Sequence, residues 1–214
     1  MIGANLSATL NAFRCLYDPS LCLPHLTVPT FAHLPIPLRI PGHTGEIRAV
    51  ILDKDNCITE PNALEVHGPY KDKFEALKRA YPGNRLLIVS NSSGTADDKD
   101  GKEATLISQT LAVPVLRHNV KKPGCAAEIL AHLRASPDVQ LESPSQIAVV
   151  GDRLFTDIML ANMLGAWGVW IKDGVDAKHA SAFSGLEKGL HSFLVKRGYQ
   201  PPSPAASGPP NSSP

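Results

Sequence analysis

Long apolar runs, an excess of charge of either sign and closely paired cysteines are all missing from this chain of 214 residues. No apolar stretch approaches the ~18–20 residues that a membrane-spanning helix needs, so none is expected. The 21 basic residues nearly balance the 20 acidic ones, which gives no general attraction to nucleic acid, and no nucleic-acid partner is predicted. The four cysteines form no C-x-x-C pair, which favours reduced thiols over a zinc site or a disulfide framework.

Composition divides the chain into three zones, predicted as an N-terminal segment 1–45, a folded domain 46–198 and a tail 199–214. The first zone has little charge and is rich in proline, and apolar residues spaced three and four apart between Ile2 and Tyr17 predict an amphipathic helix. Such a helix fits either a membrane surface, its own domain or a neighbouring subunit in a homo-oligomer. The Pro/Ser-rich tail contains no charge and too little apolar surface to offset its ordering entropy, so it is predicted to be disordered.

The middle zone alternates strand-like and helix-like patterns. Strands are predicted at 47–53, 85–90, 114–118, 146–152 and 167–173, and helices at 70–83, 102–113, 123–136 and 156–165. This alternation predicts an α/β three-layer sandwich, with a mostly parallel, Rossmann-like sheet covered by helices on both faces.

Polar residues follow three of the apolar strands at the point where each strand ends. Asp53 and Asp55 follow the first, Ser90 follows the second, and Asp152 follows the strand 146–152. Any one of them could be a turn former or a helix N-cap. Because parallel strands share one carboxyl edge, where ligands collect, we expect the four side chains to converge there. Carboxylate oxygens suit Mg²⁺, which would also relieve the repulsion between them.

The segments DKDNC, SNSSG, KKPG and GDRLFTD stand in the order of the four motifs of the haloacid-dehalogenase-like phosphatases. This resemblance covers about residues 46–175. More narrowly, ILDKDNCIT, VSNSSGT, KKPG and VVGDRLFTDIMLANMLG resemble the mitochondrial phosphatidylglycerophosphatase branch of that superfamily. Enzymes of the branch remove phosphate from phosphatidylglycerophosphate on the way to cardiolipin.

The resemblance implies distinct roles for the acidic residues. Asp53 would be the nucleophile that forms an aspartyl-phosphate, and Asp55 the general acid and base. Mg²⁺ would be held by the Asp53 side chain, the Asp55 backbone carbonyl and Asp152, with Asp157 supporting this metal shell. The chain departs from the general superfamily pattern at Cys57, where Thr or Val is usual. A cysteine is expected there in the narrower branch, and we predict a packing residue rather than a catalytic thiol.

The resemblance also implies a phosphate-binding set. Ser90 would hydrogen-bond the phosphoryl oxygens, helped by backbone N–H groups of Asn91 and Ser92. Lys122 would neutralise charge on the phosphate and on the nucleophile. Lys121 is the alternative for this role, but the family motif places its lysine directly before proline, which favours Lys122.

The intervals 54–89 and 91–121 are too short to hold a folded cap domain besides their predicted helices, so a capless fold with an open site is expected. An open site gains little from enclosing a small metabolite and can reach a phosphate on a membrane headgroup or a protein. The basic residues Lys54, Lys121 and Arg153 near the predicted mouth could contact a second headgroup phosphate or be solvated.

These observations predict a Mg²⁺-dependent hydrolase of phosphatidylglycerophosphate. The resemblance implies a mitochondrial location, peripheral on the matrix side of the inner membrane. Alternatives are a capless phosphatase of phosphoproteins or small soluble phosphates, and a non-catalytic binding module of the same fold.

Overall fold

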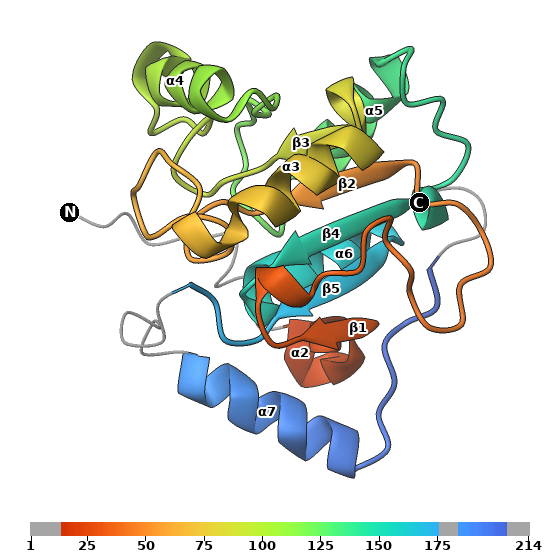
Figure 1. The fold of residues 1–214 in the computed structure, drawn as a ribbon. Coiled ribbons are helices and arrows are strands. Elements are labelled where there is room, and N and C mark those ends of the chain that lie inside the picture. Colours follow the sequence, from red (N-terminus) through yellow and green to blue (C-terminus); the bar gives the residue numbers. More distant parts are fainter. Residues whose placement is uncertain (1–13, 176–183, 205–214) are drawn as a thin grey trace.

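The computed structural model describes residues 14–175 and 184–204. Its centre is a five-stranded parallel sheet in the order β1-β5-β4-β2-β3 (Figure 1). The strands are β1 (Leu26–Val28), β2 (Ala49–Leu52), β3 (Leu86–Ile88), β4 (Ile147–Gly151) and β5 (Trp167–Ile171). The predicted α/β class is confirmed.

The central strands are apolar throughout because both faces of the sheet are covered. In β2, Val50 and Leu52 face one hydrophobic core, whereas Ala49 and Ile51 face the other. Ile51 pairs with Leu87 of β3 on one side and with Val149 of β4 on the other, which places β2 in the interior of the sheet.

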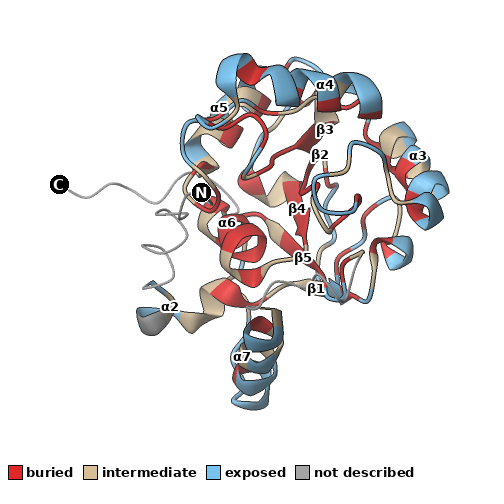
Figure 2. Cartoon of the chain, turned by 90° about the vertical axis from the view of Figure 1, so that its left-hand side faces the viewer, coloured by how far each residue is buried: buried red, intermediate tan, exposed pale blue. Residues whose placement is uncertain are grey.

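Helices form the two outer layers. Helices α3 (Lys71–Ala80) and α4 (Lys102–Leu111) contribute Phe74 and Ile107, among others, to the first core. Helices α5 (Ala126–Ala135) and α6 (Met159–Leu164) contribute Ile129 and Leu160 to the second. Figure 2 shows buried strands between α3 on one side and α5 and α6 on the other. The remaining helices are α2 (Arg14–Tyr17) and α7 (Ser184–Lys196), and short 3₁₀ turns occupy Pro19–Cys22, Phe31–His33, Gly68–Tyr70, Gly83–Arg85, Lys99–Gly101 and Pro144–Gln146.

The proline-rich N-terminal segment is part of the sheet. Its strand β1 pairs with β5, and Phe31 and Leu34 are fully buried in the first core. The segment therefore contributes to the α/β domain that the sequence places at 46–198. Of the helix predicted between Ile2 and Tyr17, only α2 falls within the described residues.

Two further predicted segments differ from the structure or extend beyond the described residues. The strand predicted at 114–118 forms only an isolated bridge between Val115 and Ile88. Pro114 at its start has no N–H group to donate, which confines it to an edge. The tail begins in contact with the residue before β1, because the Pro202 carbonyl lies 2.9 Å from His25 Nε2. Residues 205–214 lie outside the described range.

Candidate active site

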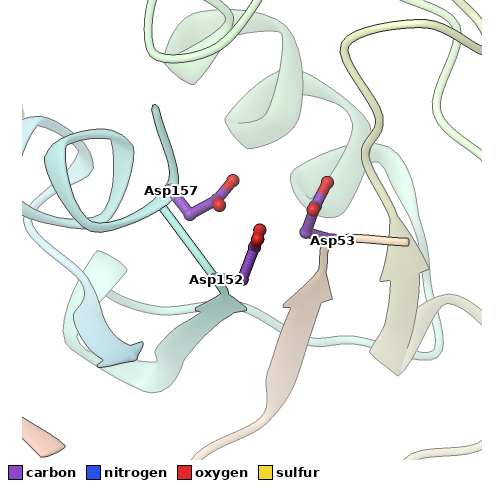
Figure 3. A group of neighbouring side chains, drawn as sticks. All are labelled: Asp53, Asp152 and Asp157. Carbon is purple, nitrogen blue, oxygen red and sulfur yellow. The ribbon is translucent and has the colours of Figure 1, made fainter. Parts of the chain in front are cut away.

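Three aspartates converge at the carboxyl edge of the sheet. Asp53 follows β2 directly and Asp152 follows β4 directly, at the point where the strand order reverses along the chain. Figure 3 shows the Asp53, Asp152 and Asp157 carboxylates gathered above the ends of these strands, and one oxygen of each lies within 4.8 Å of the others.

Asp157 reaches the cluster from a local irregularity of the chain. It lies in a single π-helical turn (Leu154–Ile158), a feature that is frequent at functional sites. Gly151 makes room for it, because a Cβ atom there would overlap the Asp157 carboxyl group. The backbone N–H of Arg153 donates to Asp157 Oδ2 at 3.1 Å and fixes the orientation of the carboxylate.

Lys122 places an ammonium group in hydrogen-bond contact with this cluster. Its Nζ donates to Asp53 Oδ1 at 2.5 Å and to Asp157 Oδ1 at 2.7 Å, and the side chain is 1% exposed. Burial alone would lower the pKa of Lys122, but Asp157 and Asp53 raise it above its usual value, so the amine is charged. Lys121 instead pairs with Asp97 at 2.6 Å.

Two cations, the Lys122 ammonium and the Arg153 guanidinium, face three carboxylates. Burial alone would lower the pKa of Arg153, but Asp157, Asp53 and Asp152 raise it. Burial, reinforced by the charges of Asp53 and Asp157, raises the pKa of Asp152 to about 8, although the Asn56 side-chain amide donates to Asp152 Oδ2 at 2.8 Å. Asp152 Oδ1 is buried and has no hydrogen-bond partner among the described residues. Unmatched carboxylate oxygens fit a hard divalent cation, and the cluster is compatible with a metal. The structure brings Asp157 into the same oxygen cluster as the two predicted carboxylate ligands, Asp53 and Asp152.

Asp55 lies beside the cluster in a different environment. Its Oδ1 accepts hydrogen bonds from Lys54 Nζ at 2.5 Å and from the Asn62 backbone N–H at 2.8 Å, while the Ser92 hydroxyl lies 3.4 Å from Oδ2. Lys54 is 1% exposed and also donates to the Ala63 carbonyl at 3.0 Å. The predictions that Lys54 contacts a second phosphate or is solvated are therefore both wrong.

The loop after β3 carries the predicted phosphate-binding residues. Ser90 is buried, and its Oγ accepts from the backbone N–H of Ser92 at 3.2 Å. Asn91 Oδ1 accepts from the backbone N–H of Lys122 at 2.7 Å, and the buried Asn91 Nδ2 has no partner among the described residues. The Asn91 side chain therefore joins this loop to the backbone of Lys122.

His118 connects this loop to the lysine loop and was not identified from the sequence. Its two ring nitrogens lie 2.9 Å from the Ser90 carbonyl and 2.8 Å from the Val120 carbonyl. Asn56 was not identified from the sequence either, although it directly follows the paired aspartates. In the structure it has φ 58°, a left-handed conformation that asparagine tolerates. The histidine has no comparable signal in the sequence, because its partners are backbone carbonyls.

Cys57 packs beneath the site. It is fully buried within the first core, and burial together with the charge of Asp53 raises the pKa of its thiol well above the usual value. A neutral buried thiol is a poor nucleophile, which agrees with the prediction of a packing residue.

A parallel α/β sheet with acidic residues and a buried lysine at its carboxyl edge is consistent with the haloacid-dehalogenase-like phosphatases. The model of the mitochondrial PGP phosphatase family matches residues 6–176, and the chain belongs to this family.

Relatives with curated names agree. The chain is 48% identical over 190 residues to the mitochondrial phosphatidylglycerophosphatase GEP4 of Saccharomyces cerevisiae, which covers 89% of this chain and 98% of that protein. It is 38% identical to a probable mitochondrial phosphatidylglycerophosphatase of Schizosaccharomyces pombe, over 76% of this chain and 79% of that protein. A chloroplastic phosphatidylglycerophosphate phosphatase of Chlamydomonas reinhardtii is 36% identical over 78% of this chain and 59% of its own length. No solved structure matches.

Proposed function

We propose that the protein is a Mg²⁺-dependent phosphatase that converts phosphatidylglycerophosphate to phosphatidylglycerol and phosphate in the cardiolipin pathway. The names of the relatives support the substrate. The observation that carries the chemistry is the position of Asp53, which is buried at a strand end between Lys122 and two further carboxylates.

The reaction would pass through an aspartyl-phosphate. An Asp53 carboxylate oxygen attacks phosphorus, and the bond from phosphorus to the glycerol oxygen breaks. Asp55 gives a proton to the departing oxygen and then takes one from the water that hydrolyses the aspartyl-phosphate. Lys122, Ser90 and Asn91 would stabilise charge on the phosphoryl oxygens.

Asp53, Asp152 and the Asp55 backbone carbonyl would hold Mg²⁺, and Asp157, within the same cluster, would hold it directly or through water. When bound, the ion neutralises the carboxylates and lets a negatively charged phosphate approach them.

We propose further that the enzyme acts while bound to a bilayer surface, on the matrix side of the inner mitochondrial membrane. Among the described residues, none of the helices has the length and apolar character of a membrane span. On α7 the side chains of Leu186 and Phe193 are 61% and 51% exposed, and the basic residues Lys196 and Arg197 follow them. The first turn of this helix lines the same recess as Asp152. Such a surface suits an anionic bilayer. A homo-oligomer stays a prediction.

The test is release of phosphate from phosphatidylglycerophosphate in vesicles, measured with Mg²⁺ and after removal of Mg²⁺ by a chelator. The proposal expects turnover only with the metal. Faster hydrolysis of phosphopeptides or sugar phosphates than of the lipid would favour the alternative phosphatase functions. Absence of turnover on all of these and on an aryl phosphate would favour a binding module.

A further inference from the structure

Lys54 is a buried lysine to which the proposed chemistry assigns no role. It stands between the two aspartates in sequence, and its side chain is one of the largest fully buried side chains of the molecule. Its ammonium group donates to Asp55 Oδ1 at 2.5 Å and to the Ala63 carbonyl at 3.0 Å. A buried charge is costly unless it is paired and hydrogen-bonded, so these two contacts fix the position of the amine.

The contacts of Asp55 distinguish its two oxygen atoms. Oδ1 accepts from Lys54 Nζ at 2.5 Å and from the Asn62 backbone N–H at 2.8 Å. Oδ2 has only a long contact, at 3.4 Å, from the hydroxyl of Ser92, which lies 2.9 Å from Ser90 Oγ in the phosphate-binding loop. One oxygen is therefore held by the protein, and the other faces the loop at which we place the phosphate.

We propose that Lys54 is a positioning residue that fixes Asp55 so that Oδ2 is the atom that gives and takes the proton. This inference rests on the proposed function, in which Asp55 is the general acid and base. In the first step the proton leaves Oδ2 for the departing oxygen as its bond to phosphorus breaks. In the second step Oδ2 takes a proton from water as the water oxygen bonds to phosphorus and the Asp53–phosphorus bond breaks.

The test compares two substrates whose leaving groups differ in their need for a proton. A defect in the positioning of the acid slows only the substrate that needs the proton, whereas a general structural defect slows both. Release of the leaving group is measured in single turnovers, with enzyme in excess, for phenyl phosphate and para-nitrophenyl phosphate. Phenolate needs a proton as it departs, whereas the nitrophenolate leaves readily without one. We expect Lys54→Met to lose about 10²-fold with phenyl phosphate and no more than about threefold with the nitrophenyl compound. An equal loss on both substrates would overturn the proposal.

A double variant tests whether Lys54 acts through Asp55. If it does, Lys54→Met combined with Asp55→Asn reacts with phenyl phosphate no more slowly than Asp55→Asn alone, whereas independent roles would multiply the two losses. Lys73→Met is the matched control, since Lys73 also donates to a backbone carbonyl, that of Leu34 at 2.9 Å, but lies on α3 outside the site. We expect this control to keep wild-type rates.

Two further measurements keep the outcomes apart. Thermal unfolding shows whether Lys54→Met folds, and Lys54→Gln, which keeps a donor in the pocket, replaces it if it does not. The aryl phosphates make the result independent of the lipid. An enzyme that hydrolyses them but not phosphatidylglycerophosphate would contradict the proposed substrate and still decide the role of Lys54.

Discussion

The two aspartates of the first motif occupy environments of opposite character. Around Asp53, two more carboxylates lie near the Lys122 ammonium and the Arg153 guanidinium, and a buried oxygen of Asp152 has no hydrogen-bond partner among the described residues. Around Asp55, one lysine balances one carboxylate, and a backbone N–H completes the pairing. The surroundings of Asp53 are therefore compatible with an additional cation, whereas the position of Asp55 is already fixed by contacts within the protein. This difference suits a nucleophile that must meet an anion and a proton carrier that must keep one orientation.

The largest effect should follow from removal of the nucleophile. Asp53→Asn keeps the size of the side chain but cannot form an aspartyl-phosphate, so turnover should fall about 10⁴-fold or more on every substrate. Phosphate release measures it. Asp138→Asn, which alters a carboxylate bound to Asn84, is the control and should keep wild-type activity. Comparable rates for Asp53→Asn and wild type would show that Asp53 is not the nucleophile, and the contrast drawn between Asp53 and Asp55 would then have no functional meaning.

The two adjacent lysines should differ sharply. Lys122→Met removes the only described ammonium group within hydrogen-bond distance of Asp53 and Asp157, and we expect kcat to fall about 10²–10³-fold. Lys121→Met removes a partly exposed pair with Asp97, and its effect on kcat should stay below about twofold. Steady-state kinetics on one substrate compares them. Similar losses of kcat in the two variants would mean that the buried position of Lys122 beside Asp53 does not make it more important for catalysis than Lys121.

Gly151 tests the metal side of the site without changing a charged residue. In Gly151→Ala the new methyl group would displace the Asp157 carboxylate, so the affinity for Mg²⁺ should fall about 10–100-fold. A Mg²⁺ titration of activity measures this change. Gly189→Ala on α7 is the control, because a Cβ atom there meets nothing within 4 Å. Equal Mg²⁺ dependence of the two variants would show that Asp157 has no part in holding the ion.

The smallest effect concerns stability and its pH dependence. The pKa of Asp152 in the folded protein, about 8, lies above the ~3.9 of an unfolded aspartate, so the folded state binds this proton more tightly. Its contribution to stability is therefore complete below about pH 4 and is lost as pH rises towards 8. Without metal above pH 8, Asp152→Asn should melt roughly 2–4 °C higher than wild type.

Mg²⁺ should then raise the melting temperature of the wild type more than that of this variant, as thermal scans with and without the ion would show. A variant that melts lower than wild type without metal would mean that the Asp152 charge is compensated inside the protein.

The sequence predicted the parts of the site that depend on strand ends. Apolar strands that stop at Asp53 and Asp152 must bring both residues to one edge if the sheet is parallel, and the strand order places them on neighbouring strands. The roles of Lys54 and His118 could not be predicted. His118 contacts only backbone carbonyls, and Lys54 contacts the Ala63 carbonyl and the Asp55 side chain, whose position depends on the fold of the loop. Gly151 was missed for a related reason, since the need for space appears only when the π-helical turn is known.

The N-terminal strand was missed for lack of a pattern. A segment of three residues, Leu26–Val28, is too short to show the alternation that identifies a strand, and the prolines around it suggest irregular structure. Its partner β5 supplies the hydrogen bonds that define it. Tertiary pairing rather than local preference decides this part of the fold.

The most direct test of the account is chemical trapping of the intermediate. The enzyme is mixed with phosphatidylglycerophosphate and Mg²⁺, quenched in acid and treated with borohydride, which reduces an acyl phosphate to an alcohol, and its peptides are then sequenced by mass spectrometry. The account predicts that residue 53 is converted to homoserine, and that neither residue 55 nor the Asp53→Asn variant is modified. Reduction at another aspartate, or none during active turnover, would contradict it.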